Sequence, residues 1–74
     1  MTFLSLCTDD GIAATAEVDD KVWNSYCGSI ARAAYAAGYL TRVSNVADGL
    51  RPSQTCHTMA DVSDFIAKTA GWIS

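Results

Sequence analysis

This chain of 74 residues has little of what usually carries chemistry. It holds one histidine, one proline and three cysteines, and only 18% of its residues are charged. It contains no G-x-x-x-x-G-K-[ST] loop, no dinucleotide-binding glycine fingerprint and no G-x-S-x-G sequence. These absences argue against a nucleotide-dependent enzyme and against an α/β-hydrolase. The sequence therefore predicts a non-enzymatic protein with no catalytic residues and no cofactor.

Metal-site spacing is also missing. Cys7, Cys27 and Cys56 are widely separated and form no C-x-x-C element, whereas a structural zinc ion normally takes four ligands. The single histidine, His57, adjoins Cys56, and adjacent side chains seldom converge on one point. We expect no bound metal, three reduced thiols, and Cys27 as a small core residue.

Long apolar runs are absent too. No stretch approaches the ~20 apolar residues that cross a bilayer, and the beginning, MTFLSLCTDD, has no basic region followed by a long apolar segment. The sequence predicts no membrane association and a cytoplasmic location, which would be the host cytoplasm for a viral protein.

What the chain does have is apolar residues, at 50% of the total. We expect one compact domain over 1–74, because a chain this short buries only about 60% of its unfolded surface and divides no further. A typical soluble protein has about 25% charged residues, so a fraction of 18% indicates an unusually uncharged surface. That composition favours a protein partner or a homodimer.

The clearest predicted element is a helix over 20–37, with the sequence KVWNSYCGSIARAAYAA from residue 21. Asp19 or Asp20 is suited to cap its beginning, and Gly38 is suited to end it. At about 100° per residue, its apolar positions share one arc that we expect to face the core. These are Val22, Trp23, Tyr26, Cys27, Ile30, Ala33, Ala34 and Ala37.

Two further helices are predicted, over 42–48 and 59–70. The first would begin after Thr41 and end before Gly49, since apolar residues recur at helical spacing at Val43, Val46, Ala47 and Leu50. The second would be capped by Thr58 and ended by Gly71, after which Trp72 and Ile73 would fold back on the last turn. Its apolar face holds Met59, Val62, Phe65, Ile66, Thr69 and Ala70.

Residues 1–18 allow two interpretations. We favour a short helix over 9–17, because Thr8 followed by two aspartates is a helix-start signal and alanine is a poor strand former. The fold class predicted is thus mainly α, a small bundle of three to four helices. The alternative is an α+β fold with an N-terminal hairpin over 2–18, since apolar residues alternate from Ile12 to Val18.

The face of helix 20–37 opposite the apolar arc is nearly free of charge. We call its Ser25, Gly28, Ser29, Arg32, Tyr35 and Ala36 the low-charge strip. A solvated helix usually carries several Lys and Glu on such a face, and small residues allow close approach of another backbone. The strip therefore predicts a docking surface, for a partner or for a second copy of the chain. The alternative is an ordinary alanine-rich surface.

These features favour a small protein that occupies a partner protein as an inhibitor, adaptor or anti-activator, for example a phage-encoded inhibitor of host or immune machinery. Tyr and Arg are frequent at interface hot spots, and Tyr35 and Arg32 share the strip. Four aspartates are further candidate partner-binding residues, because they would meet a basic surface. They are Asp9, Asp10, Asp19 and Asp20, although helix starts also explain such pairs.

The alternative function is a small DNA-binding regulator. Helix 20–37, a turn and helix 42–48 have the order of a helix-turn-helix, in which Arg42, Ser44, Asn45 and Arg51 would face DNA. The formal net charge of −3 is unfavourable for phosphate binding, which makes nucleic acid the less favoured partner.

Overall fold

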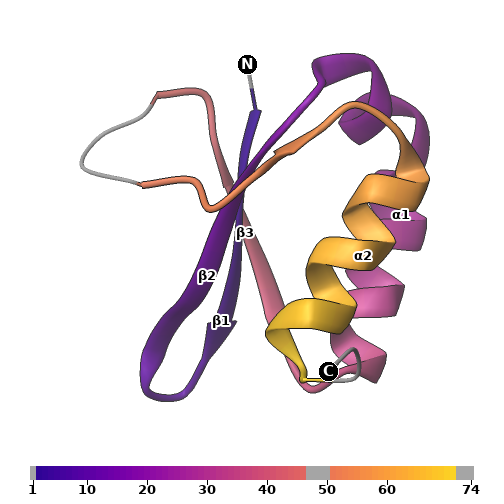
Figure 1. The fold of residues 1–74 in the computed structure, drawn as a ribbon. Coiled ribbons are helices and arrows are strands. Elements are labelled where there is room, and N and C mark those ends of the chain that lie inside the picture. The colour runs from indigo at the N-terminus through magenta and orange to yellow at the C-terminus, as the bar shows by residue number, and fades with distance from the viewer. Residues whose placement is uncertain (1, 47–50, 72–74) are drawn as a thin grey trace.

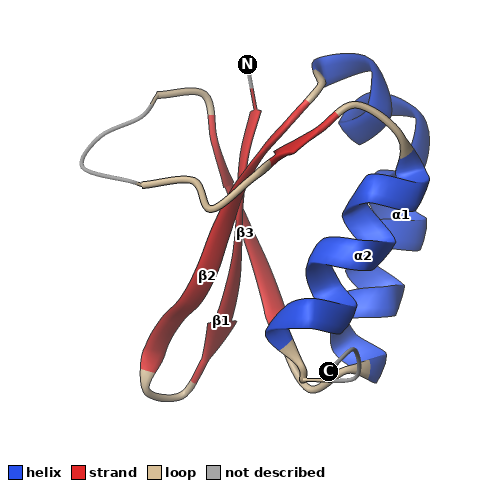
Figure 2. Ribbon diagram, viewed as in Figure 1, coloured by secondary structure: helices blue, strands red, loops and turns tan. Residues whose placement is uncertain are grey.

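The chain folds into two layers, a four-stranded sheet and two helices on one of its faces (Figures 1 and 2). The computed structural model describes residues 2–46 and 51–71. In chain order the elements are β1 (Thr2–Thr8), β2 (Gly11–Val18), α1 (Asp20–Ala36), β3 (Leu40–Ser44), β4 (Thr55–Cys56) and α2 (Met59–Thr69).

The strand order in the sheet is β3-β1-β2-β4. β1 and β2 form an antiparallel hairpin, β3 is antiparallel to β1, and β4 runs parallel to β2. α1 packs over β1 and β3, whereas α2 packs over β2 and β4 and against α1. The helices thus lie side by side on one face, and β3 and β4 are the two edges of the sheet.

The core lies between the sheet and the helices. Side chains alternate across a strand, so every second residue of the hairpin points toward the helices. Leu4, Leu6, Ala16 and Val18 do so, and each is completely buried. They pack with Val22, Ile30 and Ala34 of α1 and with Cys56, Val62, Phe65 and Ile66.

The opposite face of the sheet is polar at its centre. The hydroxyl oxygens of Ser5 and Thr15 lie 3.0 Å apart and share a hydrogen bond, which satisfies both groups where they are buried. Ser53 extends the parallel pairing beyond β4, since its backbone N–H donates to the carbonyl oxygen of Thr15 at 2.8 Å.

The predicted helix over 9–17 is wrong, because those residues form the turn of the hairpin and most of β2. The strand is paired on both sides, with β1 and with β4. Ala14 and Ala16 have low strand propensity, but here they contribute to the core against the helices. Pairing on both sides and packing in the core outweigh the low strand propensity of alanine. The fold is therefore α+β, not a helix bundle, and the alternative hairpin over 2–18 agrees with the observed strands.

The predicted helix over 42–48 is also wrong over its described residues. Leu40–Ser44 is a strand, in register with β1 through pairs such as Leu4 with Val43. The helical spacing of apolar residues was coincidental, since Val43 and Val46 are 47% and 61% exposed. The helix-turn-helix interpretation is overturned with it, because its recognition helix is an edge strand. Residues 47–50 of that prediction lie outside the described part of the chain.

The other two helices occur where the sequence predicts them. α1 ends in a Schellman motif, in which Tyr39 N–H donates to Ala34 O at 2.9 Å and Gly38 adopts φ +94°. Thr58 caps α2 as predicted, its hydroxyl accepting from Asp61 N–H at 3.2 Å. The predicted contacts of residues 72 and 73 fall outside the described residues.

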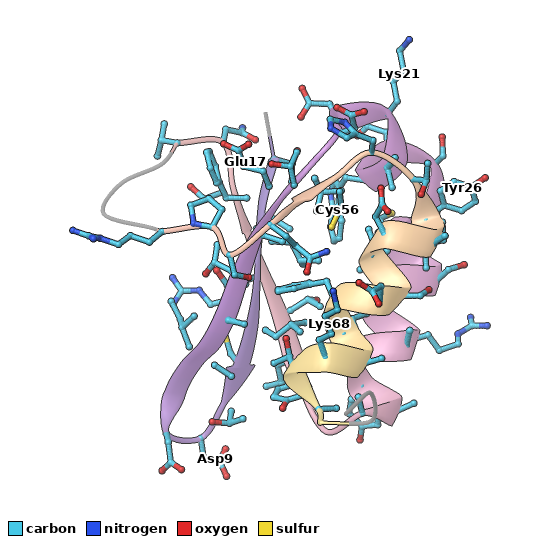
Figure 3. All side chains as sticks on the ribbon, in the orientation of Figure 1. Asp9, Glu17, Lys21, Tyr26, Cys56 and Lys68 are labelled. Atoms are coloured by element: carbon cyan, nitrogen blue, oxygen red, sulfur yellow. The ribbon has the colours of Figure 1, made fainter. Side chains whose placement is uncertain are left out.

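The buried stripe of α1 is narrower than the predicted apolar arc. Val22, Ile30 and Ala34 are buried, but Tyr26 is 46% exposed and Cys27 is exposed. The expectation that these two belong to the core is therefore wrong. Figure 3 shows the Tyr26 side chain pointing outward from α1.

In the part of the chain that the structure describes, neither helix has the length and apolar character to cross a membrane.

Candidate functional site

The low-charge strip lies on the outer surface of α1. All six of its residues are exposed. Gly28 falls almost opposite the buried stripe formed by Val22, Ile30 and Ala34, so the centre of the strip points away from the sheet. Arg32 is the single charged side chain between Val22 and Ala36. The structure thus leaves this face open to solvent.

Gly28 packs against no other part of the chain that the structure describes. A Cβ built on it would meet no atom within 4 Å among the described residues. A glycine in the middle of a helix costs about 1 kcal/mol relative to alanine, and here no internal close approach offsets that cost. Because Gly28 has no side chain, the helix surface at this position of the strip is low, and another backbone could lie close to α1 there.

Tyr35 is the most exposed large apolar side chain among the described residues, at 74%. It stands at the C-terminal end of α1, where it lines a shallow hollow with Gly38, Tyr39 and Leu40. Tyrosine presents a large rigid surface together with a hydroxyl group, the combination favoured at protein interfaces. The strip thus ends at an aromatic residue beside a depression.

The four candidate aspartates do not form one surface. Asp9 and Asp10 lie in the turn beyond the Thr8–Gly11 end of the hairpin, whereas Asp19 and Asp20 follow its Thr2–Val18 end. At ~3.4 Å per residue, these ends are about 20 Å apart. Figure 3 shows Asp9 at one end of the molecule and Lys21, beside the second pair, at the other.

Asp19 of the second pair belongs to a group of contacts at the beginnings of α1 and α2. Asp19 Oδ2 lies 3.4 Å from His57 Nδ1, an exposed contact that is an ion pair when His57 is protonated. Asp61 Oδ2 accepts from the backbone N–H of His57 at 3.0 Å, and this bond holds the pKa of Asp61 below its usual value.

Asp19 and Asp20 each have a place at the beginning of α1. Asp19 occupies the N-cap position of α1, yet its side chain makes no capping hydrogen bond. Asp20 accepts from the hydroxyl of Thr2 at 2.8 Å, which lowers the pKa of its carboxyl and ties α1 to β1.

The cysteines and the histidine are not arranged as a reactive centre. Cys56 is completely buried, and this burial raises the pKa of its thiol, so the nucleophilic thiolate is disfavoured. Gln54 Nε2 lies 3.7 Å from its sulfur. Over residues 2–46 and 51–71, no three His, Cys, Asp or Glu side chains are grouped as metal ligands would be.

One exposed surface was missed by the sequence analysis. Among residues 2–46 and 51–71, strand β3 has a neighbouring strand on one side only, and three large apolar side chains along it and just after it are exposed. We call Leu40, Val43 and Val46 the β3 edge. The β-branched and apolar residues that follow Gly38 were the available signal for a strand, but Val43 and Val46 also match a helical spacing.

Comparison with known proteins found no matching family model, no matching curated protein and no matching solved structure. The function of the chain is therefore inferred from its own residues.

Proposed function

We propose that this protein acts by binding another protein through the low-charge strip of α1, as inhibitors, adaptors and anti-activators do. The observation that carries the proposal is the exposure of Tyr35, at 74%, on a helix face with a single charged residue. Exposed helix faces normally gain solubility from several charges. Arg32 and Tyr35 would be the anchoring side chains, and the open position at Gly28 would admit close approach.

The test is capture of partners from a lysate of the source organism, or of its host if the protein is viral, with quantitative mass spectrometry. Gly28→Arg and Tyr35→Ala should each reduce recovery of a specific partner about tenfold or more, as loss of an interface hot spot does. Tyr26→Ala is the matched control, because Tyr26 is also an exposed tyrosine of α1 but lies on the other side of the helix.

Circular dichroism must show that each variant is folded. The proposal fails if the wild-type chain enriches no partner, or if both strip variants capture the partner as well as the control does. Light scattering on Gly28→Arg separates a remaining alternative, in which the strip itself joins two copies of the chain. In that case the variant would convert a dimer into a monomer.

A further inference from the structure

The sheet carries a small cavity between β1 and β3. Both described helices lie on one face of the sheet (Figure 2), and most of the residues around the cavity belong to the other face. The volume is about 60 Å³. A water molecule takes about 30 Å³ of the liquid and drug-sized ligands need about 300 Å³ or more, so the cavity admits only a group of a few non-hydrogen atoms. The lining residues are Phe3, Ser5, Ile12, Arg42, Val43 and Ser44.

The strand register brings Ser5 and Arg42 together at this cavity. They are directly opposite residues of β1 and β3. Such residues point to the same face of a sheet, with Cα atoms about 4.5–5.5 Å apart. Leu4 and Leu6 are buried under the helices, so Ser5, which lies between them in the strand, points to the helix-free face. Arg42 points to that face as well.

Ser5 has a hydrogen-bond donor to offer in the cavity. It is 4% exposed, and its hydroxyl pairs with the hydroxyl of Thr15. Two hydroxyl groups carry two protons, and only one proton can lie between the two oxygens. The described residues provide the pair with no further hydrogen-bond partner. When Thr15 donates to Ser5, the Ser5 proton is therefore available to an acceptor placed in the cavity.

Arg42 adds a positive charge. Within the described residues it forms no ion pair, and no Asp or Glu lines the cavity. Glu17 faces Phe3 across the hairpin, but its Oε2 lies 3.4 Å from Thr55 Oγ1 of β4, on the side of the sheet away from β3. A guanidinium group and a hydroxyl donor with no carboxylate between them favour an anionic ligand.

We propose that the cavity binds a carboxylate group, which accepts hydrogen bonds from the Arg42 guanidinium and from the Ser5 hydroxyl. Arginine and carboxylate have matching planar geometry and form strong charge-assisted hydrogen bonds. Phe3 and Ile12 provide apolar contact for the carbon that bears the carboxylate. Acetate has the size that the cavity admits. The side chain of an aspartate ends in the same atoms, so the ligand is either a free short-chain acid or an aspartate of another protein.

Titration with sodium acetate at neutral pH, followed by heteronuclear NMR, tests the binding. The amide signals of Ser5 and Arg42 should shift in a saturable way at about millimolar acetate, as expected for so small a ligand. Sodium chloride at equal ionic strength is the control for salt. Acetamide is the control for shape, because it resembles acetate but carries no charge. Neither control should reproduce the acetate shifts.

Arg42→Gln should weaken acetate binding about tenfold or more, because it removes the charge and the paired donors. Arg32→Gln is the matched control. It makes the same substitution at another exposed arginine, on the outer surface of α1 rather than on the sheet, and should leave acetate binding unchanged.

Two further variants test the donor. Ser5→Ala and Thr15→Val each remove one hydroxyl of the same buried pair, so they break the same hydrogen bond. Only Ser5 lines the cavity. Ser5→Ala should weaken acetate binding about tenfold, as loss of a hydrogen bond to a charged group does, whereas Thr15→Val should retain binding. Circular dichroism checks folding, and Arg42→Gln carries the test if Ser5→Ala does not fold.

A second probe separates the two sources of the carboxylate. N-acetyl-aspartate N′-methylamide resembles an aspartate within a protein chain, and its side-chain carboxylate is its only charge. Tighter binding of this compound than of acetate assigns the cavity to an aspartate of a partner protein. Tighter binding of acetate assigns it to a free acid.

The proposal is overturned if neither probe gives saturable shifts, or if chloride or acetamide reproduces them. It is also overturned if Arg42→Gln binds acetate as tightly as Arg32→Gln does, or if Ser5→Ala, when folded, binds it as tightly as Thr15→Val does. These outcomes are independent of the proposed partner at the low-charge strip, which is scored by Gly28→Arg and Tyr35→Ala.

Discussion

The hydroxyl group of Tyr39 donates a hydrogen bond of 3.1 Å to the backbone carbonyl oxygen of Thr69. Tyr39 follows the glycine that ends α1, and Thr69 is the last residue of α2. The last carbonyl groups of a helix have no partner within it, so the bond satisfies one of them while joining the ends of the two helices.

Tyr39→Phe should lower the free energy of unfolding by about 0.5–1.5 kcal/mol, the usual net contribution of one hydrogen bond. Urea unfolding followed by circular dichroism measures the change. Tyr35→Phe is the control, because that side chain is 74% exposed and its hydroxyl group is free to bond water. Equal losses in the two variants would contradict the assigned role of the Tyr39 bond.

The two helix starts should respond differently to loss of their N-cap side chains. Thr58→Ala should destabilise the protein by about 1 kcal/mol, since the Thr58 hydroxyl accepts a hydrogen bond from Asp61 N–H. Asp19→Ala should cost less, because the Asp19 side chain makes no capping bond and loses only an exposed contact with His57. Thermal or urea unfolding of both variants in one buffer tests this order, and a larger loss in Asp19→Ala would refute it.

Acid should destabilise the fold over a pH range that is set by the pKa values of Asp20 and Asp61. The pKa values of Asp61 and Asp20 are lowered from 3.8 by hydrogen bonds from His57 N–H and from Thr2. Since the folded pKa is the lower one, the stabilisation is complete above pH 3.8 and is lost as the pH falls toward the folded values.

The melting temperature, measured from neutral pH down to below pH 3.8, should therefore begin to fall only at the acidic end of that range. Asp61→Asn should show a shallower fall over the same range, because it removes one of the responsible groups. An identical pH dependence in the variant and the wild type would show that Asp61 makes no such contribution.

Thiol reagents should distinguish the three cysteines. Cys27 is exposed, whereas Cys7 and Cys56 are buried and burial raises the pKa of Cys56. One thiol per chain should react rapidly at mildly alkaline pH, and the other two should react only as the protein unfolds. Cys27→Ser should abolish the rapid phase. A rapid phase that survives this substitution would contradict the assigned burial.

The candidate site could be predicted only in part. The low-charge strip followed from helical periodicity, and the structure leaves all six of its residues exposed. Exposure of Tyr26 and Cys27 could not be foreseen, because an apolar arc does not reveal how much of its width the sheet and α2 will cover. The β3 edge was missed for a stronger reason. Val43 and Val46 are exposed apolar side chains, and their spacing indicated the inner face of a helix, whereas the structure has Leu40–Ser44 as a strand.

The sequence by itself determined the two helices and their ends, because helix periodicity and caps are local. Gly38 and Thr58 act within a few residues of themselves, and no distant contact is needed to recognise them. Only the tertiary structure decided which remaining segments are strands. Val18 pairs with both Thr2 and Cys56, and Cys56 is 38 positions away in the sequence. The pairing that makes residues 11–18 a strand therefore involves distant parts of the chain, which local strand propensity does not take into account.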